Sequence, residues 1–176
     1  MQALFKNFTR IIMGALISTP LIFMGMVTAQ AADSTVIKRF NDWTVYKAKT
    51  KDGTLCFAAS TPKDIEPKNV RRGDIFFYVT TWPKFNVQEE VSVKLGYPLK
   101  ASSTPSITIG AKNFTLYDKG ERAYIHSSLE KNLLAAMKAG SKMVIKGTSK
   151  RGTNTTDIYS LSGVTAALKA TVSACN

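Results

Sequence analysis

The chain is poor in the residue types that most often bind metals or carry out catalysis. Its 176 residues include one histidine, His126, and two cysteines. A zinc site needs several histidine, cysteine or carboxylate ligands close together, and they are not clustered in this sequence. The sequence also lacks a G-x-S-x-G nucleophile motif and a glycine-rich phosphate-binding loop. It therefore predicts a protein with no metal, no cofactor and no enzymatic activity.

The lone histidine leaves one enzymatic alternative open. A periplasmic hydrolase-like enzyme would use His126 as the general base beside one of the many serines. A single histidine close to Tyr124 is more often structural, so we favour the non-enzymatic interpretation.

Long apolar segments are absent except near the start of the chain. Lys6 and Arg10 precede an uncharged, mostly apolar stretch, residues 11–27, and Ala29 and Ala31 then offer small side chains to a signal peptidase. This order is typical of a secretory signal peptide. A transmembrane helix needs about 20 apolar residues, whereas this stretch is shorter and is interrupted by glycine and proline. We expect residues 1–31 to be a cleaved signal peptide.

The remaining residues, 32–176, have the length of one domain and contain no linker or repeat that would divide them. They contain no second long apolar run, so we expect no transmembrane segment after signal cleavage. The protein is predicted to be periplasmic or secreted, and the sequence does not indicate its oligomeric state.

Acidic residues are half as numerous as basic ones, 12 against 24. The predicted signal peptide holds two basic and no acidic residues, so the remainder has a net charge of 22 − 12 = +10. A basic surface attracts acidic partners. For an exported protein we expect an acidic envelope polymer, a glycan or a host-surface component. An ordinary solvated basic surface is the alternative.

One group of basic residues is the candidate site for such a partner. It consists of Lys142, Lys146, Lys150 and Arg151. The even spacing of the three lysines places them on one face if they share a continuous strand. Such a row binds phosphate or sulfate groups, or it protects an exposed strand against aggregation. Few aromatic residues lie nearby, which argues against nucleic acid as the partner.

A second basic group surrounds a predicted loop, residues 61–74, and ends in an Arg-Gly-Asp tripeptide at 72–74. Some integrins recognise this tripeptide, but it also arises often by chance. We therefore favour a loop in which Gly73 supplies a turn conformation.

The two cysteines, Cys56 and Cys175, both lie in the predicted exported part. Paired cysteines in an oxidising compartment are usually joined, and no C-x-x-C spacing suggests a redox motif. We predict a structural disulfide between them; a reactive thiol pair is the alternative.

Short apolar or alternating segments with frequent turns predict a mainly β fold. The predicted strands are residues 36–46, 55–57, 75–82, 87–94, 107–109, 114–116, 123–126, 142–148 and 155–161. Residues 75–82 are apolar on both faces, which predicts a buried central strand. Trp43 and Phe77 are expected in the core, and Glu89 interrupts the otherwise regular alternation of residues 87–94.

Two segments instead have helical periodicity. Leu129, Leu133 and Met137 share one face of a helix predicted at about 127–139, and a second helix is predicted at about 163–174. We therefore expect a β-sandwich with two added helices.

The order of several short motifs resembles the invasion-associated locus B proteins of alphaproteobacteria. The matching features are Phe40-x-Asp42-Trp43-x-Val45, Cys56, Val91 to Gly96-Tyr97-Pro98, Ala136-Met137 with Gly140, Ser149-x-Arg151-Gly152-Thr153, and Asp157-x-Tyr159-Ser160-Leu161-x-Gly163.

The resemblance implies an exported, immunoglobulin-like β-sandwich and, for some members, a link to entry into host cells. Most members have no established biochemical activity. Many relatives carry a cysteine four residues after the early tryptophan, where this chain has Lys47. The departure leaves Cys56 free to pair with Cys175.

Overall fold

A computed structural model describes residues 33–120 and 122–175. The predicted signal peptide, residues 1–31, lies outside the described residues. Among the residues that are described, no helix is both long and apolar enough to cross a bilayer.

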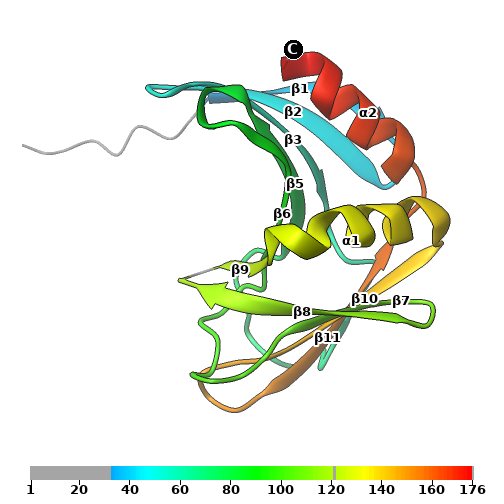
Figure 1. The fold of residues 1–176 in the computed structure, drawn as a ribbon. Helices are drawn as coiled ribbons and strands as arrows, with labels where there is room; N and C mark the ends of the chain where they lie inside the picture. The colour runs from blue at the N-terminus through cyan, green and yellow to red at the C-terminus, as the bar shows by residue number, and fades with distance from the viewer. Residues whose placement is uncertain (1–32, 121, 176) are drawn as a thin grey trace, which may run out of the picture. The chain divides into compact units, whose positions relative to one another are not determined.

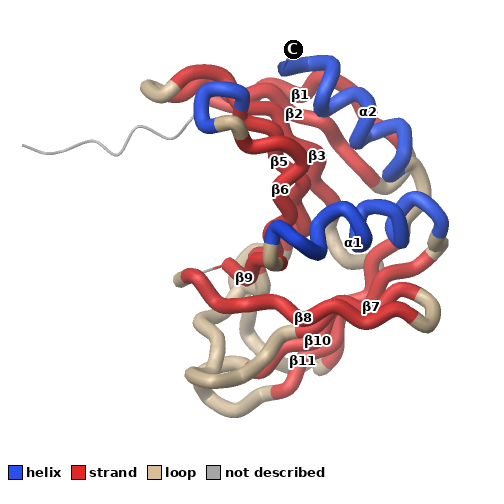
Figure 2. Tube along the Cα trace, in the orientation of Figure 1, coloured by secondary structure: helices blue, strands red, loops and turns tan. Residues whose placement is uncertain are grey.

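The described residues are mostly strand (Figure 2). Their strands are β1 (Asp33–Phe40), β2 (Trp43–Thr50), β3 (Gly53–Ser60), β4 (Asp64–Glu66), β5 (Phe76–Trp82), β6 (Val87–Lys94), β7 (Ser106–Ile109), β8 (Lys112–Lys119), β9 (Arg122–Ile125), β10 (Lys142–Thr148) and β11 (Asn154–Ser160). They pair antiparallel in the order β1-β2-β3-β5-β6-β9-β8-β7-β10-β11-β4. Strand β8 pairs with β9 in one sheet and with β7 in the other, so the two sheets share it (Figure 1).

Two α-helices complete the fold, α1 (Ser127–Ala139) and α2 (Val164–Cys175), with a short 3-10 helix, η1 (Pro83–Phe85). Both α-helices lie on the same side of the sheet formed by β1, β2, β3, β5 and β6 (Figure 1). Leu133 and Met137 of α1 and Ala167 and Leu168 of α2 are buried there. The prediction of a mainly β fold of sandwich type with two added helices is confirmed.

The predicted core residues Trp43 and Phe77 are fully buried. Their rings meet edge to face at 5.8 Å, and Phe77 meets Tyr159 of β11 at 6.0 Å. The Trp43 Nε1–H group donates to the carbonyl of Ser160, 3.1 Å away. These contacts link β2 and β5 of one sheet to β11 of the other, so the core lies between the two sheets.

Two local predictions were wrong. Residues 36–46 form two strands, because Asn41 has a positive φ of 52° and turns the chain back on itself. Asparagine tolerates this conformation better than most residues. The predicted loop 61–74 contains the short strand β4, which pairs with β11.

Candidate functional site

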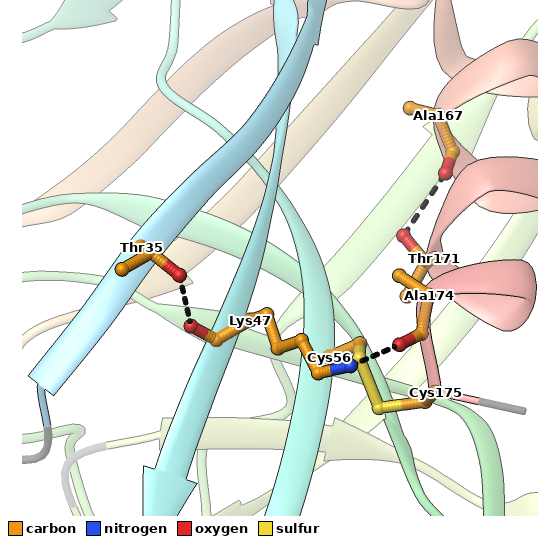
Figure 3. The surroundings of a disulfide bond; sticks show 7 residues. All are labelled: Thr35, Lys47, Cys56, Ala167, Thr171, Ala174 and Cys175. Atoms are coloured by element: carbon orange, nitrogen blue, oxygen red, sulfur yellow. Dashed lines mark hydrogen bonds between the residues drawn. A yellow bond between two sulfur atoms is a disulfide. The ribbon is translucent and has the colours of Figure 1, made fainter.

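The structure confirms the disulfide between Cys56 of β3 and Cys175 at the end of α2, residues 119 positions apart (Figure 3). Cys56 is fully buried. Because α2 packs on the inner face of the strands, the bond fastens its last turn to the neighbouring sheet.

Lys47 lies opposite Cys56 in the β2–β3 register and beside the disulfide (Figure 3). Its Nζ donates to the carbonyl of Ala174, 2.8 Å away. Carbonyl groups in the last turn of a helix lack intrahelical partners and carry partial negative charge, so a lysine there is favourable. Lys47 thus holds the end of α2 with a charge-assisted hydrogen bond.

The basic row, which we define as Lys142, Lys146, Lys150 and Arg151, occupies β10 and the turn that follows. Lys142 and Lys146 are exposed on the outer face of β10, while Met143 and Ile145 are buried on its inner face. The strand ends at Thr148, so Lys150 lies with Arg151 in the exposed turn instead of on a continuous strand with the other two lysines.

Backbone hydrogen bonds hold the turn that carries Lys150 and Arg151. The N–H of Ser149 donates to Thr153, that of Gly152 donates to Ser149, and that of Lys150 donates to Pro98, at 2.7–2.9 Å. On β10 itself, Lys146 lies opposite Ser106 of β7 and Thr156 of β11. The basic row is therefore flanked by hydroxyl groups on a hairpin held by backbone hydrogen bonds.

None of the four cations of the basic row lies within 4.0 Å of a carboxylate among residues 33–120 and 122–175. The other basic group differs. Lys63 pairs with Asp42, and Lys68 pairs with Asp64 at 3.3 Å. The basic row thus presents positive charge that no described acidic residue neutralises at short range.

Arg72 is not presented to solvent. Its side chain is 4% exposed and its guanidinium donates to both carboxylate oxygens of Asp157 at 2.6 Å, while Asp157 is fully buried. Nε and Nη2 also donate to the carbonyl of Leu95. Burial acts to lower the pKa of Arg72, but the hydrogen bonds and the charge of Asp157 outweigh it, so the pKa lies above its ordinary value.

The glycines beside this ion pair have a packing role. The N–H of Gly73 donates to the carbonyl of Gly96 at 2.8 Å, and Gly96 has a φ of +77°. A Cβ on Gly96 would lie 2.6 Å from the Gly73 carbonyl oxygen. Within the Arg-Gly-Asp tripeptide, Arg72 is therefore buried in the ion pair and Gly73 packs against Gly96, while Asp74 remains exposed.

His126 precedes α1 and is exposed, with its ring 4.7 Å from that of Tyr117. It lines a pocket of about 580 Å³ that also contains Glu90, Tyr124 and Glu130. Burial raises the pKa of Glu130, although a hydrogen bond from the backbone N–H of Val91 opposes the shift. In the described part of the chain, no hydroxyl donates to the His126 ring, and no three potential metal ligands come together.

A row of aromatic side chains on the outer face of one sheet was not predicted from the sequence. Residues 75–82 were predicted to be a buried strand, and β5 does lie between β3 and β6. Only one face of β5 is fully buried, however, and the other carries Phe76, Tyr78 and Trp82 half-exposed. The signal was the alternation of these aromatic residues with Phe77, Val79 and Thr81.

The family described as Invasion associated locus B protein matches residues 43–172. No curated protein matches the chain. No solved structure matches it either. The match spans most of the chain, including Cys56, the Arg72–Asp157 pair and the basic row, and it ends before Cys175. The chain therefore belongs to the invasion-associated locus B family.

Proposed function

We propose that the protein is an exported, non-enzymatic binding module of the cell envelope that binds an acidic polymer through the basic row. The observation that carries the proposal is the exposure of Lys142, Lys146, Lys150 and Arg151 with no carboxylate within 4.0 Å among the described residues. Exposed cations on a hydrogen-bonded hairpin suit repeated phosphate, sulfate or carboxylate groups.

Three further features support this function. The first 31 residues have the pattern of a signal peptide, and a disulfide suits an oxidising compartment. Family membership links the chain to proteins named for host-cell invasion. A surface glycan or an envelope polymer is therefore the kind of acidic partner that we propose, in the periplasm or outside the cell.

The hydrolase alternative receives less support. A hydrolase needs a nucleophile in hydrogen-bonding reach of its base, and no such hydroxyl contacts the His126 ring within the described residues. We therefore retain the non-enzymatic proposal.

Replacing Lys146, Lys150 and Arg151 together by glutamine should weaken binding to heparin, a sulfated glycan probe, by at least about tenfold at low ionic strength. Each cation near an anionic surface contributes about 1 kcal/mol to binding. The loss of three cations therefore exceeds the roughly 1.4 kcal/mol that corresponds to a tenfold change in affinity. The affinity of the unmodified chain should itself fall steeply with added salt, because exposed charges are screened over about 10 Å at 0.1 M. Fluorescence anisotropy of labelled heparin measures both effects.

The matched control replaces Arg39, Lys49 and Lys51 by glutamine. These residues are also exposed and have no carboxylate within 4.0 Å in the described part of the chain, so the control removes the same charge without breaking an ion pair. Lys63 and Lys68 are less suitable because each is paired. Equal weakening by both triple variants would show that net charge alone acts and would refute the site.

A further inference from the structure

The outer face of β5, β6, β9 and β8 carries aromatic rings from neighbouring strands. Tyr78 lies opposite Ser92 of β6, Ser92 lies opposite Tyr124 of β9, and Tyr124 lies opposite Tyr117 of β8. The rings of Tyr117 and Tyr124 stack at 6.0 Å. Cross-strand partners share a face of a sheet, so these side chains form one row.

The described helices do not cover this row. The buried residues of α1 and α2 join the core with Phe77, Val79 and Val93, which point to the opposite face of the same strands. Figure 1 shows both helices on that inner side. Tyr117 is 40% exposed, and Tyr78, Trp82 and Tyr124 are half-buried.

Two adjoining pockets follow the row. One, of about 390 Å³, is lined by Leu55, Phe57, Tyr78, Trp82, Arg122 and Tyr124, among others. The second is the pocket of about 580 Å³ beside His126, which adds Tyr117 and the polar side chains of Asn86, Gln88 and Glu130. Glu90 and Tyr124 line both pockets, so the two adjoin at these residues, and we call them together the aromatic groove.

We propose that the aromatic groove binds a neutral saccharide chain. A pyranose ring has an apolar C–H face that packs against an aromatic ring, and hydroxyl groups around its edge that need hydrogen-bonding partners. The groove offers both kinds of group: the aromatic side chains of Tyr117, Tyr124 and Trp82 line it, with Gln88 and Glu90 beside them. This site goes beyond the proposed function, because it lies on a different sheet face from the basic row and uses different chemistry.

The charge of the groove selects a neutral ligand over an acidic one. Glu90 and Glu130 repel anions. The groove's one arginine is already engaged: Arg122 lies 4.5 Å from the centre of the Tyr78 ring and donates to the Ser92 hydroxyl at 3.4 Å. A purely apolar ligand would desolvate the carboxylates and amides without replacing their hydrogen bonds. A saccharide contacts the aromatic rings with its C–H faces and forms hydrogen bonds to the carboxylates and amides with its hydroxyl groups.

The groove is long enough for several sugar units. From β5 to β8 it crosses three strand intervals of about 4.8 Å each, or about 14 Å. We therefore expect an oligosaccharide to bind more tightly than a monosaccharide of the same type.

Isothermal titration of the purified chain with neutral hexamers of glucose and of N-acetylglucosamine tests the proposal. We expect one hexamer to bind and the Tyr117→Ala variant to weaken it by about tenfold, the size expected for the loss of one stacking ring. Tyr124→Leu, tested alongside, should weaken it similarly. Tyr117 is exposed enough for its variant to fold, which its thermal unfolding midpoint checks.

The matched control is Tyr46→Ala, which removes an aromatic ring from the same sheet face but lines neither pocket. It should change affinity by less than about twofold. The triple variant of the basic row should bind the hexamer normally, which separates this site from the proposed function. Failure of both hexamers to bind at about millimolar concentration, equal weakening by Tyr46→Ala, or binding only of an acidic oligosaccharide or an apolar peptide would overturn the proposal.

Discussion

Replacement of Arg72 by methionine is expected to lower the free energy of unfolding by about 3–5 kcal/mol. The guanidinium makes two hydrogen bonds to Asp157 and two to the Leu95 carbonyl, and nothing else described bonds to that buried carboxylate. Without Arg72, the charge of Asp157 would stay buried without a partner, which costs far more than the pair itself contributes. Chemical denaturation in guanidinium measures the loss.

The sequence neighbour Arg71 provides the control. It is exposed and makes no ion pair within the described residues, so Arg71→Met should change stability by about 0.5 kcal/mol or less. The double variant Arg72→Met, Asp157→Leu should recover part of the loss, because it removes both buried charges. Equal stability of Arg72→Met and Arg71→Met would show that the buried ion pair does not hold the sheets together.

The burial of Arg72 also affects how adhesion experiments on the Arg-Gly-Asp tripeptide are designed. An Arg72 variant that no longer attaches to cells would do so because the fold has been weakened, since the guanidinium is buried against Asp157 and lies under the ring of Tyr97 at 5.1 Å. Asp74 of the same tripeptide is exposed and pairs with Lys94 at 3.5 Å. Substitution of Asp74 therefore tests recognition of the tripeptide without disturbing the buried pair.

Local patterns predicted the parts of the fold that depend on local chemistry. Periodicity placed both helices within one residue of their bounds, and the apolar faces of the strands placed Trp43 and Phe77 in the core. The disulfide followed from the presence of only two cysteines in a chain expected to be exported. Each of these inferences needs information from a few residues or from composition alone.

Contacts between distant segments were not predictable in this way. Arg72 and Asp157 are 85 positions apart. The loop at residues 61–74 was predicted to be an exposed basic segment, because the sequence did not reveal that Asp157 of β11 is the partner of Arg72. The backbone geometry at Glu89 is a second, more local feature that the sequence did not reveal. Its positive φ of 53° accompanies a shift in the β5–β6 register between Thr80 and Trp82, so the sequence showed that the alternation breaks but not with what geometry.

In the two candidate binding surfaces, too, local patterns predicted some features, and others depend on contacts between distant segments. Even spacing correctly placed Lys142 and Lys146 on one face, but it could not show that β10 ends at Thr148 and that Lys150 lies in a turn. The aromatic groove brings together Trp82, Glu90, Tyr117 and Tyr124 from four strands. It depends on the pairing of β6 with β9, which skips two intervening strands in the sequence, so no single segment reveals it.

Removal of the disulfide by the double variant Cys56→Ser, Cys175→Ser is expected to lower the free energy of unfolding by about 4–5 kcal/mol in the chain-entropy account. The cross-link joins residues 119 positions apart, so it restricts most of the unfolded chain. The native structure should change little, because Val164, Ala167 and Leu168 still bury the inner face of α2. Guanidinium denaturation measures the loss, and near-ultraviolet circular dichroism measures retention of native packing.

The redox control separates the cross-link from the substitutions. Adding a thiol reductant to the unmodified chain should lower its denaturation midpoint to about that of the double variant, while the same reductant should leave the double variant unchanged. Loss of native packing in the double variant would mean that the bond positions α2 instead of restricting the unfolded chain. If the chain is shown to be reduced and its denaturation midpoint does not change, the cross-link contributes nothing to stability. That result would contradict the prediction, because a loop of this length should contribute several kcal/mol, about 4–5 in the chain-entropy account.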